Sequence, residues 1–185
     1  MPVNAPNDKL SWKAPDFKLL SVDNEYYSFD EIKGAKGTVI AFISNQCPFV
    51  KKIIKRFVSE SIELKKIGIE TCAIMSNDVK EYPQDSFDNM KKFAKQFHFN
   101  FQYLFDESQF VAKNYKAVCT PDIYGFNQHD NLQYRGRIDS GVMNSDNKNI
   151  KRELFYAMEL IAKTNNGPKE QFNSFGCSIK WIKNE

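Results

Sequence analysis

The stretch GTVIAFISNQCPFVKK, residues 37–52, predicts a buried strand that leads directly into an amphipathic helix. Residues 37–43 are rich in apolar and β-branched side chains, a pattern typical of a central strand covered on both faces. From residue 49 onward, apolar residues recur at spacings of three and four, with lysines on the opposite face. A second apolar run follows at residues 69–76, so the stretch predicts the first half of a right-handed βαβ unit.

The rest of the chain predicts further strands and helices around this unit. They are a hairpin at 17–29, a helix beginning near Asp85 or Ser86, a strand at 101–105, a short helix at 108–115, an antiparallel hairpin at 122–138 and a helix at 149–164. The tail, 165–185, ends in the apolar GCSIKWI and is expected to pack back on the domain. This order resembles the thioredoxin-like α/β fold, a central mixed β-sheet flanked by helices, here with an N-terminal hairpin and a C-terminal extension.

Length and composition indicate one globular domain over residues 1–185. The chain has 42% hydrophobic residues, and its 26 basic and 23 acidic residues are spread along the sequence with a net charge of +3. Such a surface indicates neither a nucleic-acid partner nor a membrane partner. The sequence has neither a secretion-signal pattern nor an apolar run of about 18 residues, so we expect a cytoplasmic protein.

Four cysteines, at positions 47, 72, 119 and 177, are too few and too widely spaced for a disulfide scaffold or a close metal-binding pair. This usage favours a reducing compartment. His98 and His129 lie in polar, turn-like surroundings. We therefore predict neither a bound metal nor a cofactor.

Cys47 is the first candidate for a catalytic residue. Pro48 suits the first turn of a helix, which places Cys47 at or beside the N-cap. There its sulfur faces unpaired backbone N–H groups and the positive end of the helix dipole, which favour the thiolate, and Lys51 and Lys52 add positive potential. We expect Cys47 to be a partly exposed nucleophile. The alternative is an inert residue beside the cap.

Thr120 and Pro121 form the second candidate feature. Proline is unsuited to a central ladder position unless the chain turns there, and a cis peptide bond would supply that turn. In the thioredoxin fold, a cis-proline loop stands beside the reactive cysteine and presents its backbone to the substrate. On that comparison we expect Pro48, Thr120 and Pro121 to border the substrate. The alternative is a trans proline that opens a strand.

Several motifs together resemble the peroxiredoxin-like branch of the thioredoxin superfamily, grouped with the alkyl hydroperoxide reductase and thiol-specific antioxidant proteins. They are APDF (14–17), NQCPFVK (45–51), SND (76–78), YPQDS (82–86), DES (106–108), VCTPD (118–122), YRGRID (134–139) and GCSIKW (176–181). The resemblance covers nearly the whole chain. It implies a thiol-disulfide oxidoreductase or thiol-dependent antioxidant protein, acting on thiol or disulfide proteins or on peroxide, with an external thiol reductant.

The sequence departs from that branch around Cys47. Thioredoxin carries Cys-x-x-Cys, but Val50 replaces the second cysteine here. Peroxiredoxins carry Pro-x-x-x-Thr-x-x-Cys, and aligning either Cys47 or Val50 with that cysteine leaves the proline and threonine unmatched. Two alternatives therefore stay open: a one-cysteine peroxidase resolved by an external thiol, and a non-catalytic, redox-responsive binding module.

A second thiol would have to resolve oxidised Cys47. Cys72 lies within an apolar strand, where burial explains it better. Cys119 is our first choice, because the resemblance places the loop before Pro121 beside the reactive cysteine, and Cys177 in the tail is the second. Arg135 and Arg137 alternate along a predicted strand, and we expect them to form a solvated face.

Overall fold

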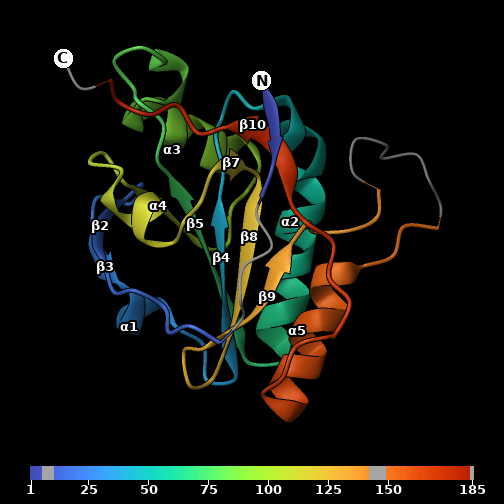
Figure 1. Cartoon of the computed structure of the whole chain (residues 1–185). Coiled ribbons are helices and arrows are strands. Elements are labelled where there is room, and N and C mark those ends of the chain that lie inside the picture. The colour runs from blue at the N-terminus through green and yellow to red at the C-terminus, as the bar shows by residue number, and fades with distance from the viewer. Residues whose placement is uncertain (6–10, 142–148, 184–185) are drawn as a thin grey trace.

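The computed structural model describes residues 1–5, 11–141 and 149–183. Within these residues, the main sheet has seven strands in the order β3-β2-β6-β5-β4-β8-β9 (Figure 1). The strands are β2 (Lys18–Ser21), β3 (Tyr26–Ser28), β4 (Gly37–Phe42), β5 (Ile69–Met75), β6 (Gln102–Phe105), β8 (Asp122–Asn127) and β9 (Leu132–Gly136). β4 pairs parallel with β5 and antiparallel with β8, which confirms the predicted mixed sheet and N-terminal hairpin.

Helices cover both faces of this sheet. They are α1 (Phe29–Ile32), α2 (Pro48–Lys66), α3 (Phe87–Gln96), α4 (Phe110–Asn114) and α5 (Glu153–Thr164), with a 3₁₀ turn η1 (Pro83–Asp85) before α3. Alternate residues of β4 enter two apolar clusters, Val39 with α2, α3 and α5, and Ile40 with α1 and α4. Every residue of β4 is buried, as the sequence predicts for a central strand. No helix among the described residues is long and apolar enough to cross a membrane.

A second, smaller sheet lies at one end of the main sheet. It joins β1 (Pro2–Asn4), β10 (Phe175–Ser178) and β7 (Cys119–Thr120), all antiparallel, with β10 in the middle. Figure 1 shows β10 crossing beside the amino-terminal strand, next to the end of α2 where that helix begins. Residues from the predicted tail thus supply β10, whereas residues 184 and 185 lie outside the described part of the chain.

The expectation of a solvated arginine face is wrong. Arg135 is only 5% exposed, and its Nη2 lies 2.8 Å from Asp122 Oδ2. Arg137 forms an ion pair with Glu153 at the start of α5, with Nε 2.6 Å from Oε2. Gln171 of the tail accepts from Arg135 N in β9, and Phe172 accepts from Arg137 N just after it. Alternation along a strand cannot reveal such a neighbouring segment.

Candidate active site

Cys47 is the N-cap residue of α2, with Pro48 as the first helical residue. Its backbone is extended, with φ −63° and ψ 120°, so the chain turns from β4 into the helix at this residue. The first turn of α2 contains no acidic residue, and Lys51 and Lys52 are exposed. The predicted place of Cys47 at a helix N-terminus in positive surroundings is confirmed.

The Thr120–Pro121 peptide bond is cis, as predicted. Cys47 Sγ lies 3.0 Å from the Thr120 carbonyl oxygen and donates its proton to it in the thiol form. The structure therefore brings together Cys47, Pro48, Thr120 and Pro121, four of the residues selected from the sequence.

The expectation that Cys47 is partly exposed is wrong, because the residue is only 2% exposed. The cis-proline loop lies against its sulfur on one side. β10 covers it as well, since Cys177 pairs with Thr120 and interacts with the Cys47 side chain. A large substrate can therefore reach this sulfur only if β10 moves aside.

Cys177 lies on β10, directly opposite Thr120. It is half-buried, whereas the other cysteines are buried. Burial first, then a hydrogen bond to Cys47 and the charge on that sulfur, raise the pKa of Cys177 to about 11. Cys177 thus remains a thiol at neutral pH and can donate its proton to the Cys47 sulfur.

Cys119 and Cys72 lie in more enclosed surroundings. Cys119 is fully buried on β7, and because neighbouring strand residues face opposite sides, its side chain points away from that of Thr120. Its Sγ lies 3.8 Å from the Pro121 carbonyl oxygen. Burial raises the pKa of both thiols above the usual range. Cys119 borders the cis-proline loop, and Cys177 lies opposite Thr120, whose carbonyl oxygen accepts the Cys47 proton.

Sequence reasoning missed the role of Asp85, which it considered only as a helix cap. Ser86 is the N-cap of α3, and Asp85 is fully buried beneath the turn that leads to Cys47. Its carboxylate accepts hydrogen bonds from Ser44 Oγ at 2.8 Å, Asn45 N at 2.7 Å and Gln46 Nε2 at 2.9 Å. These partners lie about 40 positions earlier in the chain, so no local pattern indicates the contact.

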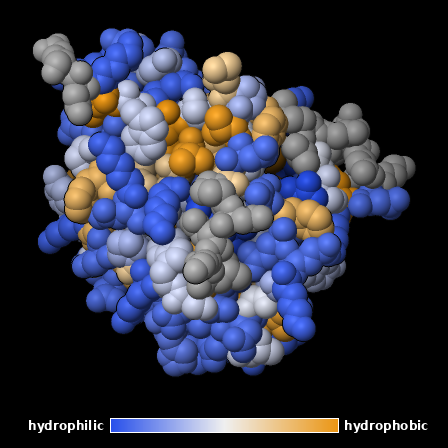
Figure 2. All heavy atoms as spheres, viewed as in Figure 1, coloured by the Kyte–Doolittle hydropathy of each residue, from blue (hydrophilic) through white to orange (hydrophobic). Residues whose placement is uncertain are grey.

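A small apolar cavity of about 60 Å³ is lined in part by Phe49, two residues after Cys47, and by Pro121 of the cis-proline loop. Its apolar walls are formed mainly by Phe49, Ile53, Pro121, Ile138 and Phe175, and the rings of Phe49 and Phe175 meet edge to face at 5.2 Å. Figure 2 shows apolar residues gathered where β10 crosses the molecule. A larger groove, of about 520 Å³, lies between α3 and β6 and is lined by none of the cysteines.

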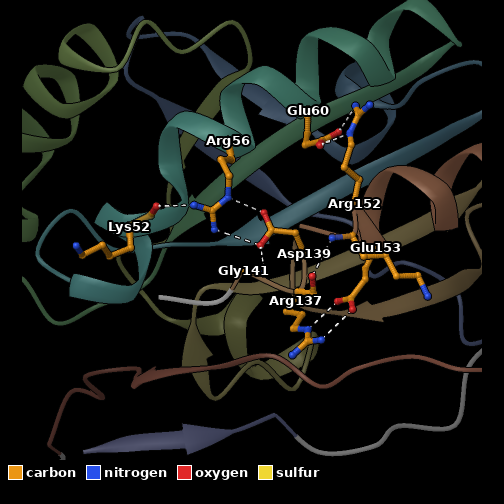
Figure 3. Close-up of polar contacts among 10 residues, drawn as sticks. Lys52, Arg56, Glu60, Arg137, Asp139, Gly141, Arg152 and Glu153 are labelled. Atoms are coloured by element: carbon orange, nitrogen blue, oxygen red, sulfur yellow. Dashed lines mark hydrogen bonds and ion pairs between the residues drawn. The ribbon is translucent and has the colours of Figure 1, made fainter. Parts of the chain in front are cut away.

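Ion pairs hold the charged side chains near this cavity. Arg137 and Asp139 also line the cavity. Arg137 binds Glu153, and Asp139 binds Arg56 (Figure 3). Among residues 1–5, 11–141 and 149–183, no group of three or more histidine, cysteine, aspartate or glutamate side chains could hold a metal ion.

Comparisons with known proteins concern the chain as a whole. The model of the AhpC/TSA family matches residues 11–138. An uncharacterized conserved protein from Geobacillus kaustophilus is 36% identical, with a TM-score of 0.95 over 100% of this chain and 98% of its own. A hypothetical protein from Sinorhizobium meliloti 1021 is 30% identical, with a TM-score of 0.92 over 98% of this chain and 99% of its own.

A more distant structure shares the fold. A peroxidoxin from Mycobacterium tuberculosis is 15% identical, with a TM-score of 0.59 over 70% of this chain and 85% of its own. The comparison with curated proteins gives no match.

Proposed function

The chain belongs to the AhpC/TSA family, and from that premise we propose that it is a thiol-disulfide oxidoreductase with Cys47 as the attacking residue. Family membership supports a redoxin-type function in general. The observation that supports the specific proposal is the shared neighbour of the two cysteines: Cys47, at the N-terminus of α2, donates to the Thr120 carbonyl oxygen, and Thr120 pairs directly with Cys177 on β10. This pair replaces the Cys-x-x-Cys arrangement that Val50 interrupts.

The surroundings of the two thiols support different roles. The thiolate is the nucleophile in disulfide chemistry. Cys47 stands at the N-terminus of α2, the end of a helix that attracts nearby negative charge, and Cys177 lies close by, opposite Thr120. Cys177, with its pKa raised to about 11, keeps its proton until a later step. We therefore assign attack to Cys47 and resolution to Cys177, ahead of Cys119.

The proposed reaction transfers two electrons to a substrate disulfide. The Cys47 thiolate attacks one substrate sulfur, a mixed disulfide forms, and the other substrate sulfur leaves as a thiolate. Cys177 then loses its proton and attacks Cys47, which forms the Cys47–Cys177 disulfide and releases the second substrate sulfur. Two protons complete the two substrate thiols. An external thiol reductant restores the protein dithiol by the same exchange in reverse.

Substrate would approach beside the cis-proline loop. The apolar cavity, with Phe49 and Phe175 on its walls, offers space for an apolar group beside Pro121 of that loop. Thr120 and Pro121 offer backbone beside Cys47, although Thr120 is paired with β10 in this state. A protein disulfide therefore requires β10 to move.

The burial of Cys47 favours a second candidate function, thiol-dependent reduction of peroxide. A small peroxide can reach the sulfur of a residue that is only 2% exposed with less rearrangement than a protein disulfide. The Cys47 thiolate would attack one peroxide oxygen, become a sulfenic acid and release the alcohol or water after protonation. An external thiol, or Cys177, would then attack the sulfenic sulfur and release water.

Peptide mapping of oxidised cysteine variants tests the proposal. The parent protein, Cys177→Ser, Cys119→Ser and Cys72→Ser are each treated with oxidised glutathione or with hydrogen peroxide. We expect a Cys47–Cys177 disulfide in the parent and in the last two variants. In Cys177→Ser, we expect glutathione to stay attached to Cys47.

Other products would distinguish the alternatives. A Cys47–Cys119 disulfide would assign resolution to Cys119. Sulfenic acid on Cys47 with no internal disulfide would support the one-cysteine peroxidase. If Cys47 stays unmodified under both treatments, the result would support the non-catalytic binding module.

A further inference from the structure

Asn77 joins the two segments that carry the reactive cysteines. Asn77 is only 4% exposed and lies two residues after the end of β5. Nδ2 donates to Asp85 Oδ2 at 2.7 Å, and Oδ1 accepts from the backbone N–H of Lys180 at 2.9 Å. Lys180 lies three residues after Cys177. One amide group therefore touches both the support of the Cys47 turn and the segment that leaves β10.

On the Asp85 side, the bridge leads directly to Cys47. The carboxylate binds Ser44, Asn45 and Gln46, the three residues that precede Cys47. Its donors are a hydroxyl, a backbone N–H and two amide groups, all neutral. Three of these four donors belong to the turn itself and remain when Asn77 is replaced, so that change keeps the turn but removes its link to Lys180.

On the Lys180 side, further bonds fix the segment after β10. The Lys180 carbonyl oxygen accepts from Asp78 N at 2.8 Å and from Gln109 Nε2 at 2.7 Å. Gln109 Oε1 also accepts from Ile182 N at 2.8 Å. The segment after Cys177 is thus anchored at the carboxyl end of β5, and Asn77 is the link from that anchor to Asp85.

We propose that Asn77 is a positioning residue that holds Cys177 against Cys47 and so sets the reduction potential of this pair. The inference rests on the proposed function. Disulfide formation between two thiols of one chain depends on their effective concentration, which rises when both segments are held in place. Loosening the bridge lowers this concentration. The disulfide then becomes easier to reduce.

The test measures the equilibrium between the protein dithiol and oxidised glutathione, which yields the protein disulfide and two reduced glutathione molecules. Asn77→Ala removes both bonds, and Asn77→Asp keeps an acceptor for Lys180 but places a carboxylate against Asp85. We expect each variant to lower the equilibrium constant at least tenfold, equivalent to a rise in potential of about 30 mV. Asn89→Asp is the matched control, because Asn89 binds the Pro83 carbonyl oxygen at 3.0 Å on the exposed side of the same turn.

A second measurement separates positioning from a general loss of structure. In the Cys177→Ser background, Asn77→Ala should change the rate at which Cys47 attacks oxidised glutathione by less than threefold. Lys180→Pro removes the N–H that Asn77 binds and leaves Asn77 and Asp85 intact. Lys180→Pro should also lower the equilibrium constant about tenfold. If circular dichroism shows that Asn77→Ala does not fold, the Lys180→Pro result decides between the outcomes.

The outcomes separate this inference from the function on which it rests. A parent protein that forms no Cys47–Cys177 disulfide in any glutathione buffer overturns both. The positioning role alone is overturned if the parent forms this disulfide and the equilibrium constants of Asn77→Ala and Lys180→Pro lie within threefold of the parent's value.

Discussion

Cys47 and Cys177 carry the same functional group in different surroundings. Cys47 is the N-cap residue of α2, whereas Cys177 is a half-buried residue on the neighbouring strand β10. The raised pKa of Cys177 has two causes, burial and the neighbouring Cys47 sulfur, and a substitution can separate them. The raised pKa of Cys177 therefore depends partly on its own burial and partly on the presence of Cys47.

Cys47→Ala should lower the pKa of Cys177 below about 11, because the variant keeps burial but removes the hydrogen bond and the charge of Cys47. Only the thiolate is alkylated, so a lower pKa moves the rise in labelling to lower pH. Iodoacetamide labelling of Cys177, followed by mass spectrometry across pH 7–11, measures the shift. Cys119→Ala is the control and should leave the profile unchanged. An unchanged profile in Cys47→Ala would assign the whole effect to burial.

At the residue scale, the sequence predicts where Cys47 lies but not how exposed it is. Pro48 and the apolar spacing that follows are local signals, and they correctly place a helix start. Exposure depends on β10, which comes from far along the chain. The same reason explains why the role of Asp85 was missed, since its partners lie about 40 positions earlier in the chain.

Among the elements, β10 decides the relation between the two thiols. Gly176 precedes Cys177, and a Cβ atom there would lie 2.0 Å from the Thr120 carbonyl oxygen. That oxygen also accepts the Cys47 proton. The close approach of β10 to β7 therefore requires glycine at this position.

Gly176→Ala should slow formation of the Cys47–Cys177 disulfide about tenfold, because the added methyl group pushes β10 from the cis-proline loop at a cost of about 1–3 kcal/mol. Quenched-flow mixing with oxidised glutathione, followed by alkylation and mass spectrometry, gives the rate. Ser178→Ala, on the same strand, should react like the parent. An unchanged rate in Gly176→Ala would mean that β10 already leaves the loop before the thiols react.

The elements of the main sheet were predicted because their patterns are local. The buried run of β4, the amphipathic α2 and the β8–β9 hairpin all have signals within a few residues. The small sheet was not predicted, because β1 and β7 are short and pair with a strand from the tail. Helix α5 begins at Glu153 rather than near residue 149.

Across the whole molecule, ion pairs join α2, α5 and the segment after β9. Arg56 binds Asp139, Arg152 binds Glu60, and Arg137 binds Glu153 (Figure 3). Their arginines are partly exposed, so each pair contributes about 1 kcal/mol or less. The Arg135–Asp122 pair differs because both side chains are buried.

Arg135→Met should destabilise the fold by about 3–5 kcal/mol at pH 7, because it leaves Asp122 buried without its cation. Burial already raises the pKa of Asp122, and Arg135 opposes that rise. In the variant, the folded state therefore binds a proton more tightly than the unfolded state, and its stability falls as pH rises above about 4. Urea unfolding at pH 5 and pH 8 should show the larger loss at pH 8.

The double variant Arg135→Met/Asp122→Asn controls for the charge on Asp122. It should recover stability at pH 8 and remove the extra dependence on pH. An equal loss at both pH values in Arg135→Met would show that packing against the Tyr124 ring, 4.7 Å from the guanidinium, matters more than charge.

The pairing of β1 with β10 has a practical consequence for anyone who produces this protein. Residues 2–4 form one edge of the sheet that carries Cys177, and the Met1 carbonyl oxygen accepts from Ser178 N at 3.2 Å. A purification tag fused ahead of Pro2 would be attached to the neighbour of the reactive strand. A redox potential measured on the tagged protein would therefore include the effect of the tag on this sheet. The same measurement on a sample with the tag cleaved off separates the two.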